Sequence, residues 1–191
     1  MKKISTLIAI VAMTLLSASI SSCSGKNDEP RNPNNPQSDN DKYFVKITTS
    51  ALNNEVPSMF DISYECTFES GQAPVKGTVN LSQTQSQKIM VDKVPNVVTV
   101  TFTQSLRNDF VPTKEKYGVG FLKTLEAYKT NNDQTSAIGG GETFANSWVV
   151  KYDYLKEAGK GTVTVKMTFD KDGKASISYE ESSFKEMAKR N

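Results

Sequence analysis

The chain has 191 residues, of which 37% are hydrophobic and 23% are charged, with a formal net charge of +2 and no histidine. The missing histidine excludes serine–histidine–aspartate and cysteine–histidine catalysis, histidine zinc sites and histidine-ligated haem. We therefore expect a protein without metal or cofactor that is not an enzyme.

The N-terminus has the layout of a secretory leader. Lys2 and Lys3 precede an apolar run over residues 4–16, and small residues lead on to Ile20-Ser21-Ser22-Cys23. The run is too short to span a bilayer comfortably. An aliphatic residue three places before a cysteine resembles the bacterial lipobox, which implies a signal peptide over residues 1–22 and a lipid on Cys23. An ordinary signal peptide with a chance cysteine and an uncleaved anchor are the alternatives.

Loss of that leader changes the charge balance. Removing Lys2 and Lys3 from the 23 basic side chains leaves 21, which equals the 21 acidic ones. A nearly neutral chain gives no reason to expect a nucleic-acid partner. The lipid on Cys23 makes a membrane the expected attachment, because acyl chains hold a protein there without help from the domain.

Residues 23–41 read as a lipidated cysteine followed by a disordered tether. Large apolar residues are missing from 24 to 41, and three prolines interrupt a run rich in Asn, Asp and Ser. A flexible coil of this length spans roughly 25 Å. The acidic pair Asp28 and Glu29 resembles the export signal of Bacteroidetes-type surface lipoproteins, although an ordinary solvated linker has the same composition. We expect a protein of the outer membrane, on the cell surface or the periplasmic face.

Residues 42–191 are long enough for one domain with its own core. The clearest segment, residues 60–69, alternates apolar and polar side chains without a fault, which predicts a half-buried strand. Cys66 lies on its apolar face and has no disulfide partner once Cys23 is acylated, so we expect a buried, inert thiol. The apolar side chains of that face are Phe60, Ile62, Tyr64, Cys66 and Phe68.

The same period recurs along the domain. Residues 163–169 and 175–179 alternate on either side of Asp170-Lys171-Asp172-Gly173-Lys174, which predicts a hairpin whose turn binds no calcium. Further strands are predicted around Tyr43, Val45 and Ile47; Val75, Val79 and Leu81; Ile89 and Val91; and Val98, Val100 and Phe102.

The segment around the Val94-Pro95 turn resembles immunoglobulin-like modules of such lipoproteins. We therefore expect an all-β fold, an immunoglobulin-like antiparallel β-sandwich of about seven to nine strands, with a lipocalin-like β-barrel as the alternative. Residues 117–130 fit either a strand or a short helix. The spacing of Ser183 and Glu186 predicts a short C-terminal helix. The adjacent Ser182 and Lys185 match a penicillin-recognition string, which we read as part of the same helix start.

Two groups of residues are candidates for ligand binding. Trp148, Tyr152 and Tyr154 alternate with polar residues in a predicted strand, where they form either a sugar platform or part of the core. Gly139, Gly140 and Gly141 lie in residues 131–143, which we predict to be a long mobile loop; residues 107–116 are the other long loop, and recognition is expected in such loops.

No reaction is encoded by these motifs. Asp61, Glu65 and Glu69 share the polar face of one predicted strand, where acids usually provide solubility. The sequence favours a non-enzymatic lipoprotein that binds a glycan or an envelope protein. A lipocalin-like carrier of a small apolar ligand and a carboxylate-dependent glycoside hydrolase are the alternatives.

Overall fold

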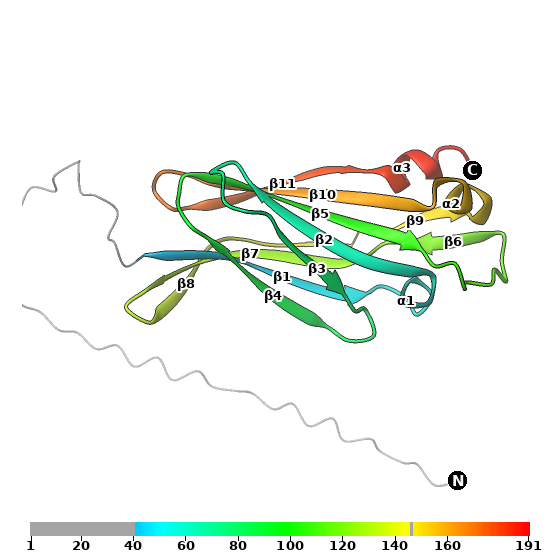
Figure 1. The fold of residues 1–191 in the computed structure, drawn as a ribbon, viewed down its shortest axis with the longest axis horizontal. Helices are drawn as coiled ribbons and strands as arrows, with labels where there is room; N and C mark the ends of the chain where they lie inside the picture. The colour runs from blue at the N-terminus through cyan, green and yellow to red at the C-terminus, as the bar shows by residue number, and fades with distance from the viewer. Residues whose placement is uncertain (1–40, 146) are drawn as a thin grey trace, which may run out of the picture. The chain divides into compact units, whose positions relative to one another are not determined.

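A computed structural model describes residues 41–145 and 147–191, drawn in Figure 1. The predicted leader, Cys23 and nearly all of the predicted tether lie outside the described residues. Asp41, the last residue of the predicted tether, forms an ion pair with Lys129 of the folded domain at 2.6 Å. Within the described ranges, no helix is both long and apolar enough to cross a membrane.

The described residues form a large, nearly closed sheet, so the all-β prediction is confirmed. Two further strands, β6 (Lys116–Val119) and β9 (Trp148–Lys151), pair separately. Three short helices, α1 (Val56–Met59), α2 (Tyr152–Ala158) and α3 (Ser183–Ala188), lie at one end of the strands (Figure 1). The order of the nine described strands in the sheet is β3 (Val75–Val79), β2 (Phe60–Phe68), β5 (Asn96–Leu106), β10 (Lys160–Phe169), β11 (Ala175–Ser182), β8 (Gln134–Phe144), β7 (Phe121–Asn131), β1 (Lys42–Ala51) and β4 (Gln85–Val91).

One contact joins the two halves of this sheet. Neighbouring strands are antiparallel except β11 and β8, which are parallel and pair only at Ala175 and Gly139. A Cβ atom at position 139 would lie 1.9 Å from the Ala175 carbonyl oxygen, and the φ of Gly139 is 152°. Only glycine permits this approach. The contact, which we call the seam, separates β3-β2-β5-β10-β11 from β8-β7-β1-β4.

Many of the alternating apolar residues, among them Val45, Ile62, Val100 and Val165, are buried and form the core, as predicted. Rings from the two halves meet there, with the centroids of Phe102 and Phe121 5.3 Å apart in an edge-to-face arrangement. Cys66 is fully buried, and burial, with a smaller contribution from the charge of Glu65, raises the pKa of its thiol to about 12. The prediction of a buried Cys66 is confirmed.

The undecided segment 117–130 is strand on both sides of Gly120, in β6 and in β7. Phe121, Leu125 and Ala127 are buried on one face of β7, so the period is two and the helical alternative is wrong. Gly120, with a φ of 124°, separates strand β6 from strand β7. The connection from β5 to β6, residues 107–115, is the predicted loop.

The prediction of a long mobile loop over residues 131–143 is wrong. Asn132 and Asp133, with φ of 46° and 62°, form a two-residue turn into β8, which pairs with β7. Positive φ at both positions suits a tight hairpin. β8 exposes most of its side chains, and two register shifts interrupt its pairing. Because neither face of β8 is buried, its sequence has no alternation of apolar and polar residues.

The strand predicted through Trp148, Val150, Tyr152 and Tyr154 is correct only as far as Lys151. Its partner β6 begins at Lys116, which pairs with Lys151, so no strand remains for the following residues. The Tyr152 amide instead donates to the Glu115 carbonyl, and helix α2 starts there.

Both predicted features of the C-terminal half are present, with one shift in position. The Asp170 side chain accepts hydrogen bonds from the amides of Asp172 and Lys174, both at 2.9 Å, which fixes the hairpin turn. Helix α3 is confirmed, but its cap is Ser182, which accepts from the Phe184 amide. Ser183 accepts instead from the Thr162 amide of β10 at 2.8 Å.

Candidate binding groove

The three aromatic candidates do not share one surface. Tyr152 packs in a cluster with Phe110 and Tyr117, at centroid distances of 6.0 and 6.1 Å. The Arg190 guanidinium lies 4.3 Å above the ring of Tyr154, whose hydroxyl donates to the Arg190 carbonyl. Trp148 is half-buried on β9. These contacts are with the protein's own side chains, and they leave no flat platform of three rings.

The three candidate glycines lie within strand β8. Gly139 makes the seam, and a Cβ atom at Gly140 would lie 2.7 Å from the Leu125 carbonyl oxygen of β7. Gly141 faces open space. The first two therefore allow close strand approach, which is a structural role.

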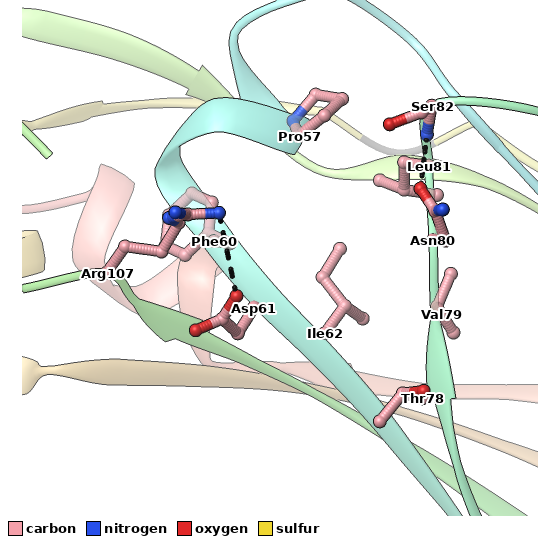
Figure 2. Close-up of a pocket in the computed structure, with 10 residues that line it drawn as sticks. All are labelled: Pro57, Phe60, Asp61, Ile62, Thr78, Val79, Asn80, Leu81, Ser82 and Arg107. Carbon is pink, nitrogen blue, oxygen red and sulfur yellow. Dashed lines mark hydrogen bonds and ion pairs between the residues drawn. The ribbon is translucent and has the colours of Figure 1, made fainter. Parts of the chain in front are cut away.

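A groove at the helical end of the sheet combines an apolar floor with polar groups. Its volume is about 350 Å³, and Figure 2 shows its lining. A second hollow, of about 410 Å³ on the β7–β8 hairpin, has polar side chains alone. The first groove is the better ligand site, because binding pockets join apolar surface to a few placed polar groups. Its lining residues are Pro57, Phe60, Asp61, Ile62, Thr78, Val79, Asn80, Leu81, Ser82 and Arg107.

The groove exists because β3 is shorter than its neighbour. Pairing of β2 with β3 begins at Ile62 and Val79, whereas pairing of β2 with β5 extends to Phe60 and Leu106. Beyond Val79 the chain turns away from β2, and the Ser82 amide donates to the Asn80 side chain at 2.9 Å. The Asn80 amide donates to Gln85 at 3.1 Å. These bonds fix the rim opposite β2.

The floor is formed by aliphatic and aromatic side chains with little exposure. Phe60 and Ile62 are each 4% exposed and Leu81 is 6% exposed. The rings of Phe60 and Phe184 form an edge-to-face pair with centroids 6.1 Å apart, so the Phe60 ring is packed within the core. The floor therefore presents aliphatic surface.

Arg107 provides the fixed charge at the rim. Its Nε and one terminal nitrogen donate to the two carboxylate oxygens of Asp109 at 3.0 and 2.9 Å, and its amide donates to the Met59 carbonyl. The hydrogen bond with Asp109 raises the pKa of Arg107 and lowers the pKa of Asp109, so both stay charged. The other terminal nitrogen lies 3.9 Å from Asp61, too far for a hydrogen bond. One donor group thus faces the groove beside the 78% exposed side chain of Asp61.

Of the three acids predicted to share a strand face, Asp61 and Glu65 lie on β2, and the three do not meet in a cleft. Asp61 is the only carboxylate in the lining of the groove. Glu65 forms an ion pair with Lys76 at 3.1 Å, and Glu69 lies beyond the end of β2. Among residues 41–145 and 147–191, no three acidic or cysteine side chains gather as metal ligands. What this arrangement supplies is hydrogen bonding above an apolar floor.

Lys123 and Gln104 are the largest buried polar side chains of the described residues, and both lie outside the groove. Lys123 is 1% exposed, and its ammonium donates to the Phe121 carbonyl at 3.2 Å. Burial lowers its pKa to about 8. Both amide atoms of the fully buried Gln104 are without a partner in the described structure. The sequence could have indicated that both side chains point inward, because each stands two residues after an inward-facing phenylalanine of the same strand.

The groove was only partly foreseeable. Arg107 begins one of the two loops predicted to carry recognition, and Asp61 stands on the predicted polar face of β2. Asn80 and Pro57 had no signal, because their proximity depends on where β3 leaves β2. No family model matches this chain, and neither the curated proteins nor the solved structures provide a match. Function is therefore inferred from the groove itself.

Proposed function

We propose that the protein is a non-enzymatic, lipid-anchored lipoprotein of the outer membrane whose domain binds a ligand in this groove. The observation that carries the proposal is the position of the groove. Strand β1 starts with Lys42 at one end of the sheet and ends beside α1 at the other, where the groove lies (Figure 1). Ten residues of strand cover about 33 Å. Within the domain, the groove therefore lies at the opposite end of β1 from Lys42.

The anchor itself rests on the sequence Ile20-Ser21-Ser22-Cys23 and on the polar tether after it. The ion pair between Asp41 and Lys129 attaches the start of the domain to β7, and the strand that follows Asp41, β1, is paired with β7 along its length. The expected partners are the membrane, through the lipid on Cys23, and a glycan or an envelope protein. The location is the cell surface or the periplasmic face.

For the fold, we infer an immunoglobulin-like sandwich with the two halves of the sheet as its layers. The support is that a single residue pair, Ala175 and Gly139, joins them, while side chains of both halves meet between. A lipocalin-like barrel is the alternative. In a barrel, the strands beside the seam would be paired along their length.

A carrier of a small apolar ligand is the second candidate, and Gln104 favours it. Both amide atoms of Gln104 are buried without a hydrogen-bond partner in the described structure, and water or a bound molecule would satisfy them. Native mass spectrometry of the protein with a palmitate probe tests this idea. One bound palmitate in the wild type, lost in Gln104→Leu, would support the carrier over the groove.

The anchor is tested by Cys23→Ala. The substituted protein is expected to leave the membrane fraction and to stay folded by circular dichroism. A processed Cys23→Ala protein that still sediments with membranes would contradict the lipid anchor.

The groove is tested by filling it. Asn80→Trp places an indole at its rim, and Thr67→Trp places the same ring on the exposed outer face of β2 as a matched control. Soluble Cys23→Ala protein is applied to an array of glycans and to purified envelope proteins. Any specific binding should disappear in Asn80→Trp and persist in Thr67→Trp. Equal binding by the two variants would overturn the groove as the site.

A further inference from the structure

We propose that the groove takes an extended peptide with an aliphatic side chain, so that the ligand is a segment of a partner protein and not a glycan. This inference rests on the proposed function, since it assumes that the groove is the binding site. Three features of the lining support it: a strand edge, an aliphatic floor, and a donor beside an acceptor.

The first feature is the edge of β2. At Ile62 this strand has β5 on one side and β3 on the other, but at Phe60 and Asp61 no strand is paired on the β3 side. The Phe60 amide is already bonded to the Val56 carbonyl, so the free stretch is short. Figure 2 shows the two chain segments diverging around the groove. Even a short free edge suits an extended peptide, because main-chain pairing of this kind has no counterpart in a sugar ring.

The second feature is the floor. Sugar sites usually offer an open aromatic face, but the only aromatic side chain of the lining, Phe60, is 4% exposed and packed on Phe184. Ile62, Val79 and Leu81 instead form an aliphatic hollow. A volume of about 350 Å³ is near the lower limit for ligand pockets, which suits one or two side chains.

The third feature is the pair of groups at the rim. A terminal nitrogen of Arg107 and the carboxylate of Asp61 lie 3.9 Å apart without a hydrogen bond between them. Arg107 is held in place by Asp109, so its donor is pre-positioned. A peptide unit beside the inserted side chain offers a carbonyl to Arg107 and an amide to Asp61. Both bonds are charge-assisted, and such bonds are stronger than neutral ones.

The experiment uses the full chain with Cys23→Ala and two blocked peptides. Both alternate threonine and valine over seven residues; one has leucine at the centre and the other has aspartate. We expect the leucine peptide to shift the backbone NMR signals of Phe60, Asp61 and Val79, and to bind about tenfold more tightly than the aspartate peptide.

Matched variants assign the contacts. Asn80→Trp should abolish binding of the leucine peptide, whereas Thr67→Trp should leave it unchanged. Asp61→Asn should weaken it about fivefold, by loss of the charged acceptor. Glu69→Gln removes the same charge at the far end of β2 and should have no effect.

The outcomes separate this inference from the proposed function. A glycan that binds wild type and Thr67→Trp but not Asn80→Trp, with neither peptide binding, would overturn the peptide inference and leave the groove as a binding site. Peptide and glycan binding that are both absent, or both insensitive to Asn80→Trp, would overturn both. Equal affinity for the leucine and aspartate peptides would also overturn the peptide inference.

Discussion

Strands β2 and β8 belong to the same sheet but are stabilised in different ways. β2 buries every second side chain and pairs along most of its length with β5 and β3. β8 has no fully buried residue, pairs with β7 through two register shifts, and meets β11 at one position. The comparison teaches that a strand needs a paired backbone, while an alternating sequence is needed only where one face is buried.

The largest expected effect separates the two strands by the same substitution. Ile62→Ala on β2 should lower the free energy of unfolding by about 3 kcal/mol, because it empties a buried site. Ile138→Ala on β8 should cost about 1 kcal/mol, since that side chain is only partly buried. Urea denaturation measures both. Equal losses would mean that β8 contributes to the core as much as β2.

The next effect concerns the seam. Gly139→Ala should cost about 3 kcal/mol, because the new methyl group would clash with the Ala175 carbonyl in a backbone conformation that already disfavours alanine. Gly141→Ala is the control, as it has φ of 84° and open space around it, and should cost about 1 kcal/mol. Hydrogen exchange in Gly139→Ala should rise first along β8 and β11. An unaltered exchange pattern there would show that the seam does not hold the halves together.

Strand β7 has a buried face like that of β2, but one of the side chains on that face is the charged Lys123. Lys123→Met should raise the free energy of unfolding at pH 7 by about 2 kcal/mol, because burial of the ammonium is relieved while one hydrogen bond is lost. Thermal or urea unfolding measures this gain. A destabilised variant would mean that the contacts of the ammonium with Phe121 outweigh the cost of its burial.

The pH dependence of the same variant carries a definite sign. The folded pKa of Lys123, about 8, is below the ordinary value of 10.5, so between these pH values the unfolded chain binds more protons and stability rises with pH. The stability gap between Lys123→Met and wild type should therefore shrink from pH 8 to pH 10. Cys66 acts oppositely above pH 9, since its raised pKa keeps the folded thiol neutral, but both proteins share it. A gap that stays constant would contradict the lowered pKa.

The smallest effect tests the turn that starts β8. Asp133→Gly gives the Asn-Gly pair favoured where both turn residues have positive φ, and Asp133 has a φ of 62°. We expect a gain of about 0.5 kcal/mol. Lys171→Gly, in the turn between β10 and β11, is the control and should not stabilise. A loss in Asp133→Gly would indicate a role for the carboxylate.

Prediction from the sequence succeeded where burial of one strand face produces an alternating pattern of apolar and polar residues. Phe60 to Phe68 and the hairpin around Asp170 were predicted because one face of each strand is in the core. Tyr152 and Tyr154 show the limit, since their alternation continued past the end of the partner strand. Residues 131–143 show the converse, since a paired but exposed strand has the composition of a loop.

By itself, the sequence determined the all-β class, the inward face of β2 and the burial of Cys66, because these depend on local periodicity. Only the tertiary structure decided that Asp61, Asn80 and Arg107 meet around one groove, because the end of β3 is set by pairing with β2 and not by any local signal. The same holds for Gly139, whose value lies in a contact with Ala175, 36 residues further along the chain. Contacts between distant segments are made by chain topology, and no window of sequence contains both partners.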